Sequence, residues 1–281
     1  MLKTKNGLEA GIIGQGTWHF GEKTTYAKTE IASLRAGIDS GMNLIDTAEM
    51  YGNGGAERII GEAIREVPRE NLYLVSKIYP HNANKRSYLA SCEDSLQRLK
   101  TDYLDLYLLH WRGITPLSEV TECMEDLKNR GMILNWGVSN FDTRDMEELY
   151  ALEYGKNCLV NQLLYHLGSR GIEYDLLPWL QERNILTMAY CPLAQAGQLK
   201  KGLYENAALN KIARSHGATA SQILLAFLLT RPQVLPIPRT RRSERALENA
   251  KASRIRLSEE ELGALDREFP PPAGKLPLDI E

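Results

Sequence analysis

Side chains suited to acid–base chemistry stand at regular intervals along this sequence. Asp46, Lys77 and His110 each end a short apolar run, and they are about 30 residues apart, the length of one strand–helix repeat. Tyr51 follows Asp46 in the adjoining loop. Because a buried charge has to be paired, we expect Asp46 and Lys77 to lie together on neighbouring strands.

These four residue types together make a proton donor. A tyrosine has a pKa near 10, which is poor for donation at neutral pH. A lysine ammonium beside Tyr51 favours the phenolate and so lowers that pKa, and Asp46 fixes the lysine. His110 on the opposite side can orient a carbonyl oxygen by hydrogen bonding. The set protonates an oxygen but supplies no reductant, so a hydride source has to come from elsewhere.

Eight short apolar runs are typical of buried strands, and each is followed by a turn and a stretch with helical features. The runs cover residues 11–16, 42–46, 72–77, 103–110, 133–139, 159–164, 185–190 and 234–238. The helix after the fourth run has the clearest limits: Thr115 is its expected cap, Pro116 fits its first turn, and Gly131 supplies a left-handed exit.

Eight strand–helix units leave two candidate folds, a doubly wound open sheet and a (β/α)8 barrel. The count of eight and the length of 281 residues, near the ~250 typical of such barrels, favour the barrel. Pro236 cannot donate to a central ladder, so we expect a very short eighth strand. The sequence has no Ser/Gly-rich linker, and we expect one domain over residues 1–281 with an irregular Pro-rich tail from about residue 269.

A Rossmann fingerprint is the alternative raised by Gly14-x-Gly16 after the first run. His19 stands at the third glycine position of that fingerprint, and no acidic residue closes a second strand ~20 residues further on. The fingerprint therefore fails, and a tight turn is the better interpretation. Such a turn also lets a backbone approach a ligand closely.

Composition excludes several classes of protein. With 34 Lys+Arg against 36 Asp+Glu the formal net charge is −2, so the basic surface of a nucleic-acid binder is not indicated. The longest apolar run, 223–229, is far shorter than the ~18 residues of a membrane span, and the N-terminus lacks the apolar core of a signal peptide. The four cysteines and five histidines show no metal-ligand spacing. We expect a cytoplasmic protein without a metal site.

Motifs along most of the chain resemble those of the aldo-keto reductase superfamily. They are NLIDTAEMYG, LVSKI, LDLYLLHW, WGVSN, VNQLLYH, MAYCPLAQAG, IPRT and ERALENA, in order from about Gly14 to Asn249 with no large gap. The segments DTAEMYGNGGAE and LYHLGSRGIEYDLLPW are most similar to bacterial members that reduce methylglyoxal and similar aldehydes.

The resemblance implies an NADPH-dependent carbonyl reductase on a (β/α)8 barrel. Tyr51 would be the general acid, tuned by Lys77 and Asp46, and His110 would position the substrate carbonyl. The nicotinamide end of NADPH would be held by Gly16, Thr17, Trp18, Ser139, Asn140, Gln162 and Tyr190. The pyrophosphate would lie along Cys191, Pro192, Leu193 and Gly197. Two tryptophans, Trp18 and Trp111, would wall the substrate pocket.

The last motifs match the family's site for the 2′-phosphate and adenine, which would comprise Ile237, Pro238, Arg239, Thr240, Arg241, Arg242, Arg245, Glu248 and Asn249. This chain has Arg-Thr-Arg-Arg where the family commonly has a lysine followed by small polar residues. Arginines can clamp a phosphate bidentately, which a lone lysine cannot, so we expect a strong preference for NADPH. Cys191 replaces a usual serine, which weakens one hydrogen bond to the pyrophosphate.

Substrate choice depends on the loops. The loop at 112–116 is short and the tail is compact, which favours an open site for small aldehydes and dicarbonyls. Three alternatives are an oxo-sugar reductase that attracts anions with Arg112, a redox-sensor module that binds NADPH with little turnover, and a lyase with Lys77 as Schiff base. Pairing with Asp46 and the nucleotide motif oppose the lyase. We expect a monomer whose partner is a small carbonyl substrate.

Overall fold

The computed structural model describes residues 2–3, 5, 7–194 and 202–281. Eight strands form one sheet in chain order, and each pairs in parallel with the next. They are β1 (Gln15–Gly16), β2 (Leu44–Asp46), β3 (Tyr73–Ile78), β4 (Leu104–Leu109), β5 (Ile133–Ser139), β6 (Cys158–Leu164), β7 (Leu186–Tyr190) and β8 (Val234–Pro236).

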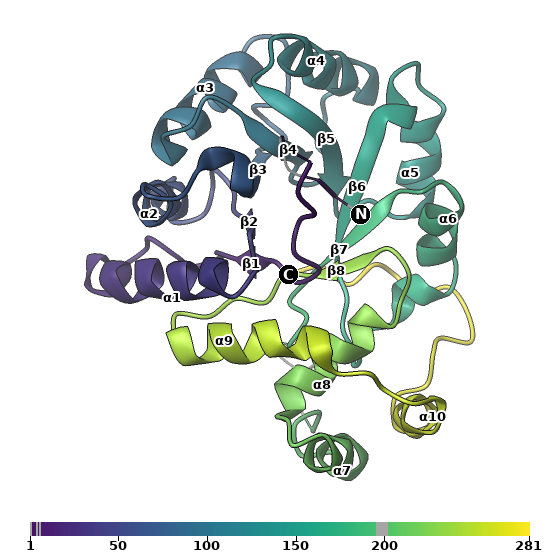
Figure 1. Cartoon of the computed structure of the whole chain (residues 1–281). Coiled ribbons are helices and arrows are strands. Elements are labelled where there is room, and N and C mark those ends of the chain that lie inside the picture. Colours follow the sequence, from purple (N-terminus) through teal and green to yellow (C-terminus); the bar gives the residue numbers. More distant parts are fainter. Residues whose placement is uncertain (1, 4, 6, 195–201) are drawn as a thin grey trace.

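The sheet closes on itself between its first and last strands. The backbone N–H of Gly14 donates to Pro236 O at 2.9 Å, and that of Gly16 donates to Pro238 O at 3.0 Å. A Cβ on Gly16 would lie 2.8 Å from Ile237 O, so this approach needs a glycine. Figure 1 shows the strands as an inner ring with helices around it. The predicted (β/α)8 barrel is confirmed, and its eighth strand is three residues long.

The outer layer consists of α-helices that follow the strands. They are α1 (Ala27–Asp39), α2 (Gly55–Ala63), α3 (Tyr88–Leu99), α4 (Leu117–Asn129), α5 (Thr143–Tyr150), α6 (Leu176–Glu182), α7 (Ala207–Ser215), α8 (Ala220–Leu229), α9 (Ser243–Lys251) and α10 (Glu259–Glu268). Single 3-10 turns lie at Thr24–Tyr26, Arg69–Asn71, Gly155–Asn157, Gly171–Glu173 and Ala252–Arg254.

The start of α4 differs from the sequence prediction. Pro116, and not Thr115, is the N-cap residue, and no side chain caps the helix. Pro116 has an extended ψ of 135°, and a proline disfavours helical backbone in the residue before it, which keeps Thr115 outside the helix. Gly131 has a φ of +74°, so the predicted left-handed exit is confirmed.

Two apolar layers hold the barrel together. Strand side chains that face inward form one cluster, which includes Leu44, Val75, Leu106, Val160 and Met188. Leu2 and Ala10 of the N-terminal segment join this inner cluster, and Figure 1 shows that segment crossing the ring of strands. The larger cluster lies between the strands and the helices. Burial of both faces explains why the strands read as nearly continuous apolar runs.

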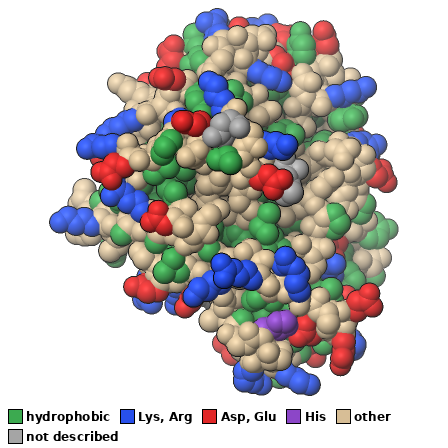
Figure 2. Space-filling view, viewed as in Figure 1, with side chains coloured by type: hydrophobic (Ala, Val, Ile, Leu, Met, Phe, Trp, Pro, Cys, Tyr) green, Lys and Arg blue, Asp and Glu red, His purple; other side chains and the backbone are tan. Residues whose placement is uncertain are grey.

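Acidic and basic side chains are interspersed over the face shown in Figure 2, in keeping with the near-zero net charge. Helices in the described part of the chain are all too short or too polar to cross a lipid bilayer.

Candidate active site

The strand ends bring the four candidate catalytic residues together. Asp46 is the last residue of β2, Lys77 is the last residue but one of β3, and His110 directly follows β4. Tyr51 lies in the loop between β2 and α2. Because neighbouring parallel strands end at the same edge of the barrel, Asp46, Tyr51 and His110 line one cavity. Lys77 does not line it but bonds to both Asp46 and Tyr51.

The Lys77 ammonium is the centre of the hydrogen-bond network. It is fully buried, and its Nζ donates to Asp46 Oδ2 at 2.8 Å, to Thr47 O at 2.8 Å and to the Tyr51 hydroxyl at 3.1 Å. Three acceptors match the three N–H bonds of an ammonium. The geometry favours a charged lysine over the neutral amine that Schiff-base formation requires.

Asp46 has a second partner that sequence reasoning missed. The Gln162 side-chain amide, from β6, donates to Asp46 Oδ1 at 2.7 Å. The family motif assigns Gln162 to the nicotinamide alone, and the two residues are 116 positions apart. Both carboxylate oxygens of Asp46 are therefore satisfied in a buried position, which a carboxylate needs in order to stay ionised.

Burial shifts the pKa values of the network. Burial raises the pKa of the Tyr51 phenol well above its usual value, and the negative charge of Asp46 raises it further. The expected lowering by Lys77 does not prevail, because desolvation of a phenolate in this cavity outweighs it. Burial likewise raises the pKa of Asp46 and lowers that of Lys77, and each shift is opposed by the other's charge.

His110 faces the same cavity as a neutral imidazole. Burial, together with the charge of Lys77, lowers the pKa of His110 to about 2. Its Nδ1 is buried and has no hydrogen-bond partner among the residues that the structure describes. Its ring meets the Tyr51 ring edge-on, with 5.6 Å between centroids. A neutral imidazole beside a phenol can hold a carbonyl oxygen without adding positive charge.

The first cavity has a volume of about 290 Å³. All of the residues predicted for the nicotinamide end and the substrate pocket lie on its wall, together with Met50 and Glu281, which sequence reasoning missed. The complete lining is Gly16, Thr17, Trp18, Asp46, Met50, Tyr51, His110, Trp111, Ser139, Asn140, Gln162, Tyr190, Cys191, Ile237, Arg239 and Glu281.

Polar side chains on one wall of this cavity bond to one another. Ser139 Oγ donates to Gln162 O at 2.9 Å, and the Tyr190 hydroxyl donates to Asn140 Oδ1 at 2.9 Å. Asn140 has a left-handed φ of +60°, a conformation that asparagine tolerates better than most residues. This network fixes the amide and hydroxyl groups in place at the ends of β5, β6 and β7.

A second cavity, of about 430 Å³, adjoins the first through a shared wall residue, Arg239. It is lined by Leu193, Tyr204, Thr219, Ser221, Arg239, Thr240, Arg245, Glu248 and Asn249. Tyr204, Thr219 and Ser221 were not predicted, because no local motif marks them. Two cavities that share Arg239, one beside the proton donor and one with arginines and polar groups, fit the two ends of a dinucleotide.

Four predicted cofactor residues in the described part of the chain line neither cavity, and the predicted Gly197 falls outside the described residues. Three of the four, Pro192, Pro238 and Arg242, lie within two positions of lining residues in the sequence. The fourth, Arg241, donates to Glu30 and to His19 O. Arg241 therefore pairs with a carboxylate of the protein, because buried Glu30 requires a cation, and its contact with a cofactor phosphate stays a prediction.

Arg112 and Cys191 are also engaged by the protein. Arg112 pairs with Asp145 and with both oxygens of Glu148, each at 2.8 Å. These two acids compete with any anionic oxo-sugar for the guanidinium. Cys191 is buried, with a left-handed φ of +48°, and burial raises its thiol pKa to about 12. A thiol with that pKa is a poor nucleophile and resists oxidation.

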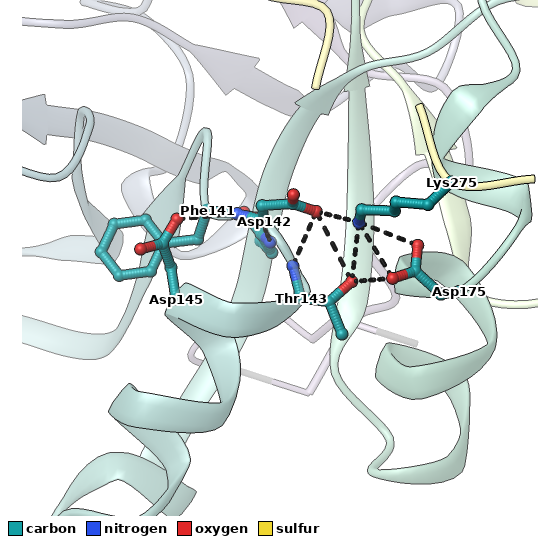
Figure 3. A network of polar contacts seen from close by, with 7 residues as sticks. Phe141, Asp142, Thr143, Asp145, Asp175 and Lys275 are labelled. Carbon is teal, nitrogen blue, oxygen red and sulfur yellow. Dashed lines mark hydrogen bonds and ion pairs between the residues drawn. The ribbon is translucent and has the colours of Figure 1, made fainter. Parts of the chain in front are cut away.

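The irregular tail after α10 reaches the active-site cavity. Figure 3 shows the Lys275 ammonium between Asp142, Thr143 and Asp175, at the start of α5 and before α6. Asp279 accepts a hydrogen bond from Ser169. Beyond these anchors, the Glu281 backbone N–H donates to the Tyr190 hydroxyl at 3.3 Å. No helix or strand follows Glu268 in this tail, and its contact with the cavity was not foreseen.

A (β/α)8 barrel with a Tyr–Lys–Asp–His network at its strand ends and a cleft for a dinucleotide defines a class of oxidoreductase. The chain belongs to the aldo/keto reductase family, whose sequence model matches residues 12–268. It is 50% identical over 280 residues to methylglyoxal reductase YeaE of Escherichia coli, covering 100% of this chain and 98% of that protein.

Other relatives share the architecture. Glyoxal reductase of Bacillus subtilis is 34% identical over 267 residues, which cover 94% of this chain and 91% of that protein. An aldo/keto reductase from Klebsiella pneumoniae crystallised with NADP and acetate is 51% identical, with a TM-score of 0.96 over 99% of this chain and 98% of that one. A Klebsiella pneumoniae structure with NADPH is 50% identical, with a TM-score of 0.96 over all of both chains.

Proposed function

We propose that the protein reduces small aldehydes and dicarbonyls, such as methylglyoxal, to alcohols with NADPH. The observation that carries the proposal is the Lys77 ammonium that joins Asp46 to the Tyr51 hydroxyl, two groups that line one cavity. The similarity to methylglyoxal and glyoxal reductases supports the substrate class. The NADP and NADPH complexes of the Klebsiella relatives support the cofactor.

Tyr51 is the proton donor in this proposal. Its raised pKa keeps the phenol protonated at neutral pH, so the acid is ready when a carbonyl enters. The Lys77 N–H that points at the phenol oxygen stabilises the phenolate that forms as the proton leaves. Asp46 holds the lysine in that position. The Lys77 ammonium therefore acts mainly on the developing phenolate, since burial outweighs its effect on the resting phenol.

His110 orients the carbonyl oxygen toward Tyr51. As a neutral imidazole it donates one hydrogen bond and leaves the Lys77 charge directed at the phenol. Trp18 and Trp111 give the same cavity apolar walls. These walls exclude water from a small organic carbonyl and strengthen the hydrogen bonds made to it.

The two cavities provide the cofactor site. Residues on the first would hold the nicotinamide end, and Thr240, Arg245, Glu248 and Asn249 on the second would hold the phosphate and adenine. NADPH bound there supplies the hydride that this set of side chains lacks. Arg239, on the wall of both cavities, is placed for an anionic group between the two ends.

The test is the Tyr51→Phe variant. We expect it to bind NADPH with unchanged affinity, because the substitution removes one hydroxyl and leaves the cavity walls in place. Aldehyde-dependent oxidation of NADPH, followed by absorbance, falls by ~10²- to 10⁴-fold, the contribution of a general acid. Asn53→Gly, in the same loop, is the control and keeps its activity, because glycine accepts the left-handed φ of +54° at this position. Near-full activity in Tyr51→Phe would mean that another group donates the proton.

We further propose that residues 1–281 act as a single domain and that the protein is a cytoplasmic monomer. All four candidate catalytic side chains come from one chain, and all eight strands belong to one sheet. Light scattering across a tenfold range of protein concentration tests the monomer, and a mass that rises with concentration contradicts it.

A further inference from the structure

A buried carboxylate lies in the first turn of α1, outside both cavities. The Glu30 side chain is 0% exposed. Its Oε1 accepts from Arg241 Nε at 2.9 Å, and its Oε2 accepts from the Gly21 backbone N–H at 3.0 Å. A carboxylate buried away from water is costly unless it is paired in this way. An exposed glutamate could fill a purely local role in the helix without that cost, so the burial of Glu30 indicates a further role.

Arg241, the cation of this pair, reaches back from the loop between β8 and α9. Its Nη2 donates to His19 O at 2.6 Å, and its guanidinium lies over the Tyr26 ring at 4.5 Å from the centroid. Glu30, His19 and Tyr26 all belong to the segment between β1 and the first half of α1. The arginine therefore joins two loops that are more than two hundred residues apart in sequence.

Two further hydrogen bonds join the same segments. Arg239 Nε donates to Trp18 O at 2.8 Å, and Ser33 Oγ donates to Thr240 O at 2.9 Å. Trp18 lines the first cavity, Thr240 the second, and Arg239 both. The bonds thus set the relative positions of the nicotinamide end and the phosphate end of the proposed cofactor site.

We propose that Glu30 and Arg241 form a latch that positions Arg239 and Thr240 for the cofactor phosphate. Glu30 is then a positioning residue for NADPH binding and selectivity, although it lines neither cavity in the described part of the chain. The inference rests on the proposed function. In this proposal Arg241 does not clamp the cofactor phosphate. It serves the phosphate site indirectly, through its ion pair with Glu30.

Charge at the site supports this assignment. Burial and the nearby Arg241 charge lower the pKa of Arg239, while Glu22 and Glu30 act in the opposite direction. Of these two acids, Glu30 is the one that bonds directly to Arg241, so it offsets the repulsion between two arginines on one short loop. Without its charge the two guanidinium groups repel each other, and the loop that carries Arg239 and Thr240 loses its fixed position.

The first measurement is the dissociation constant of NADPH and of NADH, by fluorescence titration, for the wild type and Glu30→Gln. The glutamine keeps the shape and the acceptor for Gly21 while it removes the charge. We expect NADPH to bind about tenfold more weakly and NADH to change less than about twofold, because NADH has no 2′-phosphate. An unchanged ratio of the two constants in a folded Glu30→Gln overturns the latch.

A double-mutant cycle separates the latch from a direct clamp. If the two residues act as a unit, Arg241→Met weakens NADPH as much as Glu30→Gln does, and the double variant is no weaker than either. If Arg241 binds the phosphate itself, Glu30→Gln releases it and strengthens NADPH binding while Arg241→Met weakens it. That second pattern overturns the proposal.

The matched control is the ion pair of Asp105 and Arg69. Asp105 is also 0% exposed, its arginine is 19% exposed against 27% for Arg241, and the pair lies at the start of β4, at the other end of the barrel. Asp105→Asn lowers the thermal midpoint and leaves the NADPH/NADH ratio unchanged. A ratio change in Asp105→Asn equal to that in Glu30→Gln would reduce the latch to a stability effect and overturn it.

Ser33→Ala keeps the test decisive if Glu30→Gln fails to fold. It removes the bond to Thr240 O and leaves the ion pair in place, and we expect a shift of about twofold in the same ratio. No shift in Ser33→Ala contradicts the proposal. Wild-type protein that binds no NADPH overturns the proposed function and the latch together, whereas binding with unaffected variants overturns the latch alone.

Discussion

Tyr51 and His110 face one cavity from two repeats of the barrel, with their rings in a T-shaped contact. Both side chains are neutral at physiological pH. Burial raises the pKa of the phenol, and burial with the Lys77 charge lowers the pKa of the imidazole to about 2. The phenol therefore keeps its proton for the carbonyl, and the imidazole keeps a single N–H as a donor.

The low pKa of His110 predicts a flat pH profile. Because the pKa lies near 2, His110 stays neutral from pH 5 to pH 8, whereas an ordinary histidine would gain a proton below about 6.5. With NADPH saturating, kcat/KM for an uncharged aldehyde should change less than about twofold over this range. A decrease with a midpoint near 6.5 that disappears in His110→Gln would contradict the assignment of a neutral His110.

At the scale of elements, the tail after α10 is fixed by ion pairs and not by regular structure. Lys275 binds Asp142 and Asp175 and joins the starts of two helical segments to the tail. Asp142 also caps α5, with Asp145 in a capping box. The tail then places Glu281 on the wall of the cavity. Lys275 and Asp279, which accepts a hydrogen bond from Ser169, together hold the tail beside this wall.

Lys275→Met tests the effect of the tail on the substrate. We expect KM for methylglyoxal to rise about fivefold, ~1 kcal/mol of binding free energy, because the cavity loses one fixed wall. The value of kcat should stay within about twofold, since the side-chain hydrogen bonds of Tyr51 and Lys77 within the described residues are made to each other, Asp46 and Thr47 and not to this tail. Lys85→Met, which breaks an exposed pair with Glu122, is the control. A large decrease in kcat with unchanged KM would contradict this prediction.

At the scale of the whole molecule, buried neutral histidines couple stability to pH. His166, after β6, is 1% exposed, and its Nδ1 accepts from the Gly168 backbone N–H at 3.0 Å. Burial lowers its pKa to about 4, although Asp279 in the tail opposes the shift. The unfolded chain, with an ordinary histidine pKa near 6.5, therefore binds more protons than the folded chain between these two values.

We expect the contribution of the neutral His166 to the free energy of unfolding to be fully present above about pH 6.5 and to decrease as the pH falls toward 4. His166→Asn keeps an acceptor for Gly168 and does not titrate, so its stability should fall less steeply over the same range. Urea unfolding at a series of pH values measures both slopes. Equal slopes for the wild type and His166→Asn would show that His166 is not buried as a neutral imidazole.

The sequence by itself determined the barrel and the positions of the catalytic candidates. Each strand is recognisable from its own short apolar run, and parallel strands end at one edge of the barrel. The spacing of Asp46, Lys77 and His110 at the ends of these runs therefore sufficed to place them together. The family resemblance covered the cofactor residues in the same way, because their motifs are short and contiguous. Helix limits such as Pro116 needed backbone detail that composition does not contain.

Only the tertiary structure decided which side chains pair across the barrel. The partners of Arg241, Gln162 and Tyr190 are Glu30, Asp46 and Glu281, all distant in sequence. No local pattern records these choices, because they depend on where the loops and the tail come to lie. The pKa of Tyr51 was likewise set by the folded chain, since desolvation exists only once the cavity has formed and there exceeds the effect of a neighbouring charge.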